Sequence, residues 1–512
     1  MSFVQSLLFD SSIPIKARQE ALDRAFSDPG IPPIQSTSSF WLKDPHVNLA
    51  KTQSTDLPTP TDIVIIGSGI TGASIARTLL TTGHGRDSPK PRILILEARD
   101  VCSGATGRNG GHILETVEEF TELEQSIGLE AAKKVVQFRL SHLDEVLAVA
   151  EEYGLVEEAQ ARKVQFLSVY FDDERWDEAV RCIKRFKECM PTESADWRIF
   201  EREIPTEFCL PAARGIIAGP AGALWPYRFV TGILDRLRDR FPDNLQIETN
   251  TPVLEINNTG ADQHSYSVTT ARGSIKARHL IHCTNAHVGH LVPGLRGRIY
   301  PIRGQISAQN PGQRFPSQGT KHSWLFNYDR GFDYLTQLPS GSEHDTTNKM
   351  MFGGGFAQGK NGGIDDLGIS TDSEMSFYTD IHLSGALSVT FGRENWGTVS
   401  GPAVEMMWTG NMGFSADGFP WVGRLPRSLT RRGTDANRTE KGHEWVSAGF
   451  SGEGMVHAWL CGKALGRMIL ADDEGLSEQE DLSWFPEQML VTEERAQASV
   501  LPRKVVERAS HL

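Results

Sequence analysis

A glycine-rich motif near residue 67 is the clearest candidate for chemistry in this sequence. The apolar run 61–66 leads into residues 67–72, GSGITG, which has the spacing G-x-G-x-x-G. In dinucleotide-binding sites the first glycine permits a tight turn, the second lets the backbone approach a pyrophosphate, and the third lets a helix pack close to the strand. A second apolar run, 93–96, ends at Glu97, whose carboxylate could accept hydrogen bonds from a ribose. The combination predicts a dinucleotide site, and the alternative is a glycine turn in an ordinary α/β domain.

Two further segments are rich in glycine and poor in core-forming side chains. Residues 98–112, ARDVCSGATGRNGGH, predict a loop that lies against a bound cofactor, although a flexible surface loop is the alternative. Residues 449–455, GFSGEGM, precede a helical pattern. A glycine-rich turn that opens a helix presents free N–H groups and the positive end of the helix dipole, which suits a site of negative charge.

Strand and helix patterns alternate around the first motif and predict an α/β fold. Ala73, Ala76 and Leu80 recur at helical spacing after the glycines, and a strand follows at 93–96. Helical patterns also cover 15–26, 118–160, 176–189 and 456–470, while strand patterns cover 164–171, 245–249, 253–257, 265–270, 279–283, 299–309, 324–338, 349–356, 403–407 and 445–448.

Composition excludes several classes of protein. The 512 residues have a formal net charge of −13 and no dense basic face, which disfavours a nucleic-acid partner or an anionic membrane. The six cysteines include no C-x-x-C pair, which disfavours structural zinc and a secreted disulfide scaffold. We find no signal peptide and no apolar run near the ~18 residues that span a bilayer.

The last three residues are Ser510-His511-Leu512, a conservative variant of the Ser-Lys-Leu peroxisomal address. They predict a peroxisomal protein that meets an import receptor. The alternatives are an unstructured terminus and a cytoplasmic protein.

Taken together, the motif 67–72, the loop 103–111 (SGATGRNGG) and the turn 449–455 resemble the D-amino-acid oxidase-like (DAO) family of FAD-dependent oxidoreductases. Within that family the chain is similar to the γ-glutamylputrescine oxidase branch and its fungal relatives. Several intermediate blocks lie in family order between about residues 39 and 470: GALWP (222–226), CTNAH (283–287), PIRGQ (301–305), WTG (408–410) and DGFPWVG (417–423).

The resemblance implies a Rossmann-like FAD-binding domain and a discontinuous substrate domain built on a large antiparallel sheet. The FAD-binding domain would comprise 61–152, 226–299 and 406–473, and the substrate domain 153–225 and 300–405. Residues 1–60 would form an N-terminal extension and 474–512 a C-terminal tail.

Carried over onto this sequence, the family motifs imply contacts with each part of FAD. The pyrophosphate would lie at Gly67, Gly69, Ile70 and Thr71, and the adenosine would contact Glu97, Ala98, Arg99 and Val253, with Thr284 and Asn285 at the end of a strand. The flavin would lie along Ser103, Gly104, Ala105, Thr106, Arg108, Asn109, Gly110 and Gly111. The pyrimidine edge of the flavin would contact Gly452, Glu453, Gly454 and Met455.

Departures from the family pattern refine these expectations. Gly410 stands where the sarcosine-oxidase branch has a tethering cysteine, and Arg108 where another branch has a tethering histidine, so noncovalent FAD is expected. Val456 and Leu114 replace the lysine and arginine that hold a substrate carboxylate in sarcosine oxidases, which disfavours a small N-methyl amino acid. Glu453 replaces a histidine, and a carboxylate pointing inward there would oppose negative charge on reduced flavin.

Candidates for the reaction itself are few. Tyr334, Trp324 and Tyr328 are predicted to line the substrate site, although each alone could be a core residue. Lys349 is a candidate for activating O2 beside the flavin, with a solvated lysine as the alternative. His112 is a candidate tether or proton acceptor, with a buried, hydrogen-bonded histidine as the alternative. No metal site is predicted.

We therefore expect an FAD-dependent oxidase of a primary or secondary amine, with acylated polyamines and amino acid derivatives among the candidate substrates. O2 would be reduced to H2O2. The alternatives are a flavin dehydrogenase or biosynthetic tailoring oxidase with another electron acceptor, and a non-catalytic flavoprotein that serves as an interaction module.

Overall fold

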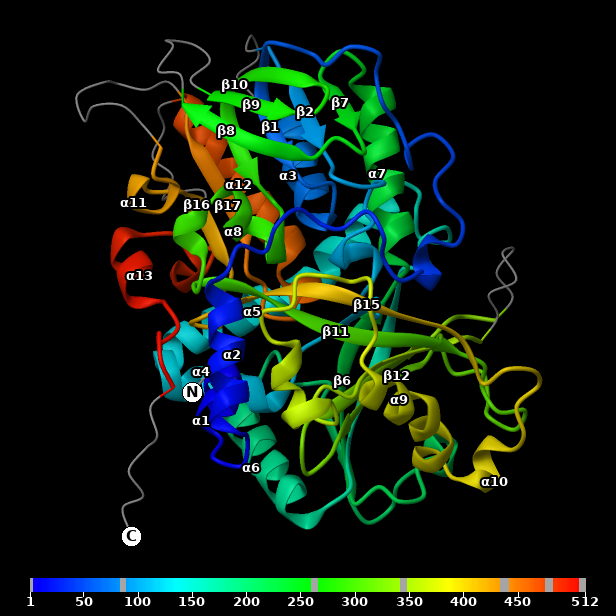
Figure 1. The fold of residues 1–512 in the computed structure, drawn as a ribbon. Helices are drawn as coiled ribbons and strands as arrows, with labels where there is room; N and C mark the ends of the chain where they lie inside the picture. Colours follow the sequence, from blue (N-terminus) through cyan, green and yellow to red (C-terminus); the bar gives the residue numbers. More distant parts are fainter. Residues whose placement is uncertain are drawn as a thin grey trace.

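The computed structural model describes residues 3–82, 89–258, 266–340, 348–432, 442–474 and 482–505. It contains two large sheets, one in the upper and one in the lower half of Figure 1. The α/β fold class is confirmed. The Ser510-His511-Leu512 end lies outside the described residues.

The first sheet has the nucleotide-binding topology that the sequence predicts. Within the described residues its strand order is β16-β17-β10-β1-β2-β7, with β8 and β9 added at β10. The central strands β17, β10, β1, β2 and β7 are all parallel. Strands β1 and β2 are almost entirely buried because helices pack on one face of the sheet and strands β8 and β9 pack over the other, which accounts for their continuous apolar runs. The strand bounds are β1 (Thr61–Ile66), β2 (Ile93–Leu96), β7 (Leu245–Glu248), β8 (Val253–Asn258), β9 (Tyr266–Thr270), β10 (Gly273–His282), β16 (Trp421–Arg424) and β17 (Glu444–Ala448).

The second sheet is largely antiparallel, as predicted. Its order in the described residues is β15-β11-β14-β13-β12-β4-β6-β3, with β5 beside β6, and β4 and β12 pair in parallel. The strand bounds are β3 (His112–Leu114), β4 (Arg162–Tyr170), β5 (Arg198–Phe200), β6 (Gly215–Ala223), β11 (Ile299–Gln309), β12 (His322–Asn327), β13 (Phe332–Gln337), β14 (Met350–Gly354) and β15 (Val404–Ser415). The predicted domain limits remain predictions; β3 and most of β15 pair in this sheet although those limits assign them to the nucleotide domain.

Helices cover both sheets (Figure 1). Near the first sheet, α3 and α12 pack closely because Gly462 and Gly466 bring the backbone of α12 against Ser74 and Thr78. The single helical pattern predicted over 118–160 is wrong in two respects: Gly128, at φ +84°, separates α4 from α5, and the helix ends at Glu152, after which residues 153–160 form turns. The helix bounds are α1 (Phe3–Phe9), α2 (Ile15–Phe26), α3 (Ile70–Thr81), α4 (Val117–Ile127), α5 (Leu129–Glu152), α6 (Asp173–Cys189), α7 (Pro226–Arg240), α8 (Val288–Leu291), α9 (Phe377–Thr390), α10 (Arg393–Trp396), α11 (Arg427–Thr430), α12 (Ala458–Glu474) and α13 (Glu493–Ala498).

The N-terminal segment is part of the globular core. Val4 and Leu8 of α1 and Leu22 of α2 pack in one apolar cluster with Tyr300 and Ile302 of β11. Among the described residues, no helix combines the length and apolar character that crossing a membrane requires.

Candidate active site

A cavity of about 1780 Å³ lies between the two sheets. It begins at the carboxyl end of β1, passes along the loop 104–110 and the turn 450–456, and reaches β13 and α4. Every residue predicted to contact FAD lines this cavity, except Ser103 and Gly111. The chain thus brings three segments distant in sequence to one space.

The start of α3 forms an anion-binding end of the cavity. Gly67 has φ +112°, and a Cβ on Gly72 would lie 2.2 Å from the Gly67 carbonyl oxygen, so strand and helix meet too closely for any side chain. Gly69 caps α3 without a side-chain hydrogen bond, which leaves N–H groups of the first turn free to face a phosphate. The Ile70 amide donates to Thr106 Oγ1 (3.1 Å), which ties this turn to the loop 104–110.

Glu97 marks the next part of the cavity. Its carboxylate accepts hydrogen bonds from the Ser68 amide (3.1 Å), the Ser68 hydroxyl (2.7 Å) and the Arg99 amide (3.1 Å). These bonds fix the carboxylate at the edge of the sheet. A carboxylate can accept about four hydrogen bonds, so acceptor capacity remains for a ribose hydroxyl.

We predict that Glu97→Ala weakens FAD binding at least about tenfold. The change removes the proposed ribose acceptor and the charged acceptor of the Ser68 and Arg99 amides, and a hydrogen bond to a charged group contributes about 1.5–3 kcal/mol. Flavin fluorescence measured on serial dilution gives the dissociation constant. Glu255→Ala, an exposed position on β8, is the control. Unchanged affinity in Glu97→Ala would remove Glu97 from the ribose site.

Two buried arginines secure the loop that follows. Arg99 and Arg108 both line the cavity and both pair with Asp372, at 3.0 and 3.1 Å. Burial lowers the pKa of Arg108 to about 10, and the Asp372 carboxylate opposes this shift. The Ser103 carbonyl accepts from both guanidiniums, so Ser103 supports the loop from behind the cavity wall.

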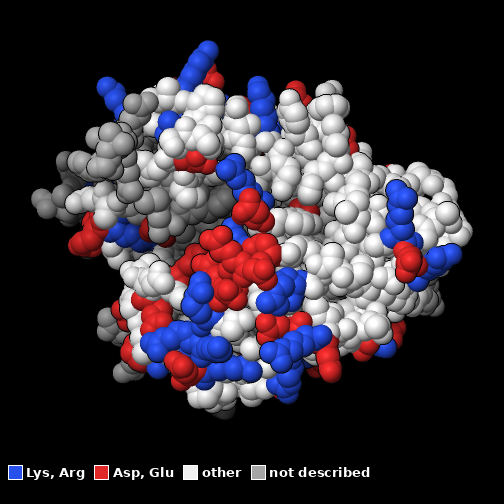
Figure 2. Space-filling view, turned by 90° about the horizontal axis from the view of Figure 1, so that it is seen from below, with Lys and Arg blue, Asp and Glu red and all other residues white. Residues whose placement is uncertain are grey.

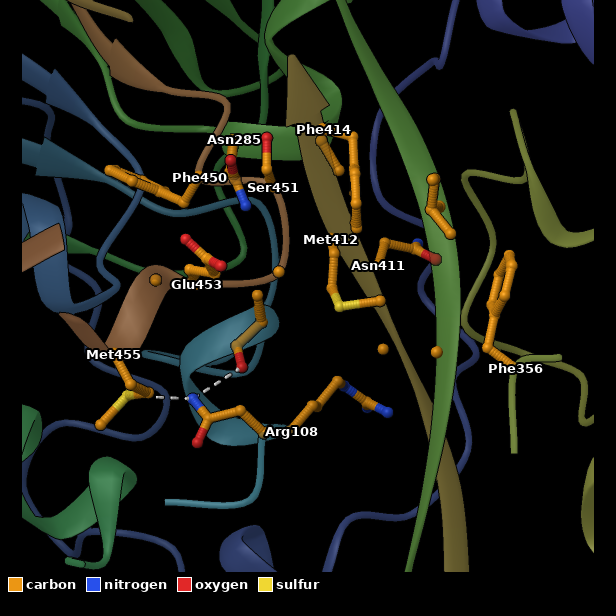
Figure 3. A pocket seen from close by; sticks show the side chains of 18 of the residues that line it. Arg108, Asn285, Phe356, Asn411, Met412, Phe414, Phe450, Ser451, Glu453 and Met455 are labelled. Carbon is orange, nitrogen blue, oxygen red and sulfur yellow. Dashed lines mark hydrogen bonds between the residues drawn. The ribbon is translucent and has the colours of Figure 1, made fainter. Parts of the chain in front are cut away.

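The glycine-rich turn 449–455 forms the wall of the cavity that faces β15. In Figure 3, Ser451, Glu453 and Met455 lie across the pocket from Asn411 and Met412 of β15. The turn reaches the loop 104–110 because Asn109 Nδ2 contacts Met455 Sδ at 3.5 Å. Glu453 is ion-paired with Arg139 (2.8 Å), so its charge is partly compensated.

These features fit a bound dinucleotide. Thr284 lines the cavity at the end of β10, and its Oγ1 is buried without a protein hydrogen-bond partner among the described residues. A buried hydroxyl of this kind calls for a partner from a ligand or water. Together with the free amides of α3 and the glycine-walled path, this donor set suits FAD.

Tyr334, Tyr328 and His112 line the cavity beyond the loop. The Tyr334 ring lies against Gly110 and Gly353, where a Cβ on either glycine would approach ring atoms to 2.6 and 2.4 Å. Burial raises the pKa of Tyr334 to about 12, so its hydroxyl is protonated at neutral pH. His112 Nε2 lies 2.7 Å from Ser323 Oγ, and burial lowers the pKa of His112 to about 3, which keeps it neutral.

Two candidates are not brought to the cavity. Trp324 is fully buried in the core of the second sheet, where its ring packs against Phe315 and Phe391; its β12 neighbour Leu325 faces the cavity instead because side chains alternate along a strand. Lys349 pairs with Glu405 and donates to Asn310. Gly111 also lies outside the lining, and its carbonyl accepts a hydrogen bond from the Leu224 amide (2.9 Å).

Four side chains that form ion pairs at the cavity wall were not predicted from the sequence: Asp372, Arg139, Glu115 and Glu119. An arginine on the apolar face of α5 was the available signal, because a buried arginine needs partners. Asp372 gave no local signal, since its two partners are far away in sequence.

Comparison with known proteins gives an independent view of this architecture. The sequence model of the DAO family, described as FAD dependent oxidoreductase, matches residues 62–468. The chain is 21% identical over 432 residues to the probable oxidoreductase OrdL of Haemophilus influenzae, covering 82% of this chain and 85% of that protein. It is 20% identical over 439 residues to the γ-glutamylputrescine oxidoreductase of Escherichia coli, covering 83% and 87%.

Among solved structures, L-proline dehydrogenase from P. horikoshii superposes with a TM-score of 0.60 at 20% sequence identity, covering 84% of this chain and 98% of that one. At this identity the likeness establishes a shared fold. The family resemblance predicted from the motifs is confirmed.

Proposed function

The chain belongs to the DAO family of FAD-dependent oxidoreductases, and from this premise we propose that it oxidises the C–N bond of a primary or secondary amine and reduces O2 to H2O2. The observation that carries the proposal is the continuity of one cavity, from the anion-binding start of α3, past Tyr334, to an acidic end at α4 and α6. An amine entering at that end would reach the wall formed by the loop 104–110 and the turn 450–456.

When bound, FAD supplies the acceptor for a hydride from the carbon beside the amine nitrogen. The residues of this chain supply binding, orientation and exclusion of water. The α3 amides and Glu97 would hold the dinucleotide, Arg108 and Asn109 would order the loop against the flavin, and Tyr334 would close one side of the substrate chamber. The resulting imine would hydrolyse to an aldehyde, with release of ammonia or an amine.

The acidic end of the cavity supports a cationic substrate. Glu118, Glu122 and Glu178 line it, and Glu122 and Glu178 are exposed. The face of the molecule seen from below carries a central group of acidic side chains bordered by basic ones (Figure 2). Carboxylates at the end of a cavity attract cations and raise their association rate. The names of the γ-glutamylputrescine oxidoreductase and the L-proline dehydrogenase also point to compounds with an amine nitrogen.

The experiment that tests this proposal is anaerobic mixing of the flavin-loaded protein with a panel of polyamines, acylated polyamines and amino acids. Bleaching of the flavin by an amine, followed by rapid reoxidation and peroxide release on admitting O2, is the expected result. Bleaching with slow reoxidation would favour a dehydrogenase or tailoring oxidase with another acceptor. No bleaching by any member of the panel would contradict amine oxidation and favour a non-catalytic flavoprotein.

We also propose a peroxisomal location, supported by the Ser510-His511-Leu512 end and by the need to destroy peroxide. A fluorescent protein fused ahead of the full chain should collect in peroxisomes. The same fusion without the last three residues should stay in the cytoplasm, and identical distributions would contradict the proposal.

A further inference from the structure

Three carboxylates surround one buried guanidinium on the cavity wall. Arg139 of α5 pairs with Glu115, with Glu119 of α4 (2.5 Å) and with Glu453 of the glycine-rich turn (2.8 Å). The Arg139 and Glu115 side chains are 6% and 1% exposed, whereas those of Glu119 and Glu453 are 29% and 32% exposed and line the cavity. We call these four residues the Arg139 cluster.

The three carboxylates share the one Arg139 guanidinium, so they also lie close to one another. Like charges held together in this way disfavour each other's ionised form. With every group ionised, three carboxylates would outnumber one guanidinium in a buried site, and an uncompensated buried charge is costly.

No other cation within the described surroundings offsets this excess. His457, which precedes α12, faces Glu453, and His142 of α5 accepts a hydrogen bond from the Trp459 amide (3.1 Å). Burial lowers the pKa of each histidine to about 3, so both are neutral. Glu122 of α4 interacts with Glu453, and its charge adds to the negative field there.

The direction of titration agrees with this geometry. Burial raises the pKa of Glu115, Glu119 and Glu453 to about 7 in each case; Arg139 opposes the shift and the neighbouring carboxylates add to it. Because the three groups are coupled, the cluster titrates as a unit.

We propose that Glu115, Glu119, Glu453 and Arg139 form a proton-holding cluster. Its protonation controls the negative charge beside the bound flavin and thereby sets the reduction potential of the flavin. The cluster holds at least one proton below neutral pH and loses it as the pH rises. Glu453 belongs to the turn that lines the FAD site, so loss of the proton adds negative charge to that wall. Negative charge disfavours the electron-rich reduced flavin, so the potential falls. This inference extends beyond the choice of substrate, because it concerns the cofactor itself.

The test measures the midpoint potential of the flavin-loaded protein from about pH 5.5 to 9. The wild type should show an added downward step near pH 7. Glu453→Gln and Glu119→Gln should each lack that step and have a higher potential than the wild type above pH 7, because the remaining carboxylates are better balanced by Arg139. Glu178→Gln, an exposed position on α6 that lines the same cavity, should retain the step.

A second measurement needs neither a substrate nor a variant that folds. The wild type at about pH 6 should show an infrared carbonyl band of a protonated carboxyl group that disappears by about pH 8.5. Thermal stability should change in parallel: the raised pKa values mean that the contribution of these groups is complete below about pH 4.5 and is lost as the pH passes 7. Absence of the band and of the potential step in the wild type, or their persistence in both glutamine variants, would overturn the proposal.

Discussion

Gly72→Ala is expected to yield a protein that does not retain FAD. A Cβ at this position would lie 2.2 Å from the Gly67 carbonyl oxygen and 3.4 Å from Ile65 Cγ2, so α3 must move away from the turn that follows β1. The obstacle is backbone, which cannot rotate aside as a side chain could. Overpacking of this kind costs about 1–3 kcal/mol, and at the upper end it corresponds to about a hundredfold loss of affinity if it falls on the bound state. The flavin absorbance per purified chain measures the outcome.

The matched control is Gly385→Ala. Gly385 lies inside α9, and a methyl group added there would have no atom within 4 Å, so alanine should be accepted and should favour the helix by up to about 1 kcal/mol. This control protein should be yellow. Full flavin content in Gly72→Ala would contradict the close strand–helix contact on which the phosphate site depends.

The second large effect is expected for Asp372→Asn, which should lower the free energy of unfolding by about 3–5 kcal/mol. Asp372 is 2% exposed and lies between Arg99 and Arg108, and removal of its charge leaves two buried guanidiniums facing each other. Since both arginines line the FAD cavity, flavin release should accompany the loss of stability. Chemical unfolding, followed with and without added FAD, separates the two effects.

Glu374→Gln controls for a change of charge in the same segment. Glu374 is exposed, and its hydrogen bonds to Arg303 and Thr409 are made by its backbone carbonyl, so the free energy of unfolding should change by less than about 0.5 kcal/mol. An Asp372→Asn protein as stable as the wild type would show that the two arginines find other partners.

Local patterns in the sequence carry much of the information about the cofactor site. The apolar run 61–66, the motif 67–72 and Glu97 lie within one βαβ unit, whose geometry follows from short-range rules, so their places in the structure could be predicted. The family resemblance extended this to the turn 449–455. The break between α4 and α5 was missed, because a glycine inside a long helical pattern does not reveal its φ.

The substrate side could be predicted less well, since it depends on contacts between distant segments. Trp324 and Tyr334 are both aromatic residues in strand patterns, and only strand register decides that Tyr334 faces the cavity while Trp324 faces the core. Arg139 and Glu453 are 314 residues apart in sequence and meet only in the folded chain. Glutamate in place of histidine at 453 looked unfavourable for a flavin site; its partner Arg139 lies on α5, and no local pattern indicates that α5 lies beside the turn 449–455.

The order of strands in the first sheet has a consequence for attempts to divide the protein. Its strands come from three stretches, 61–96, 245–282 and 421–448, and the intervening stretches build the other sheet. No single cut in the gene therefore releases either half intact, and truncation libraries should return almost no soluble fragments. The first sheet is complete only when the last stretch has left the ribosome, so productive folding should be largely post-translational and slow. The nascent chain should depend on chaperones until β17 pairs with β10.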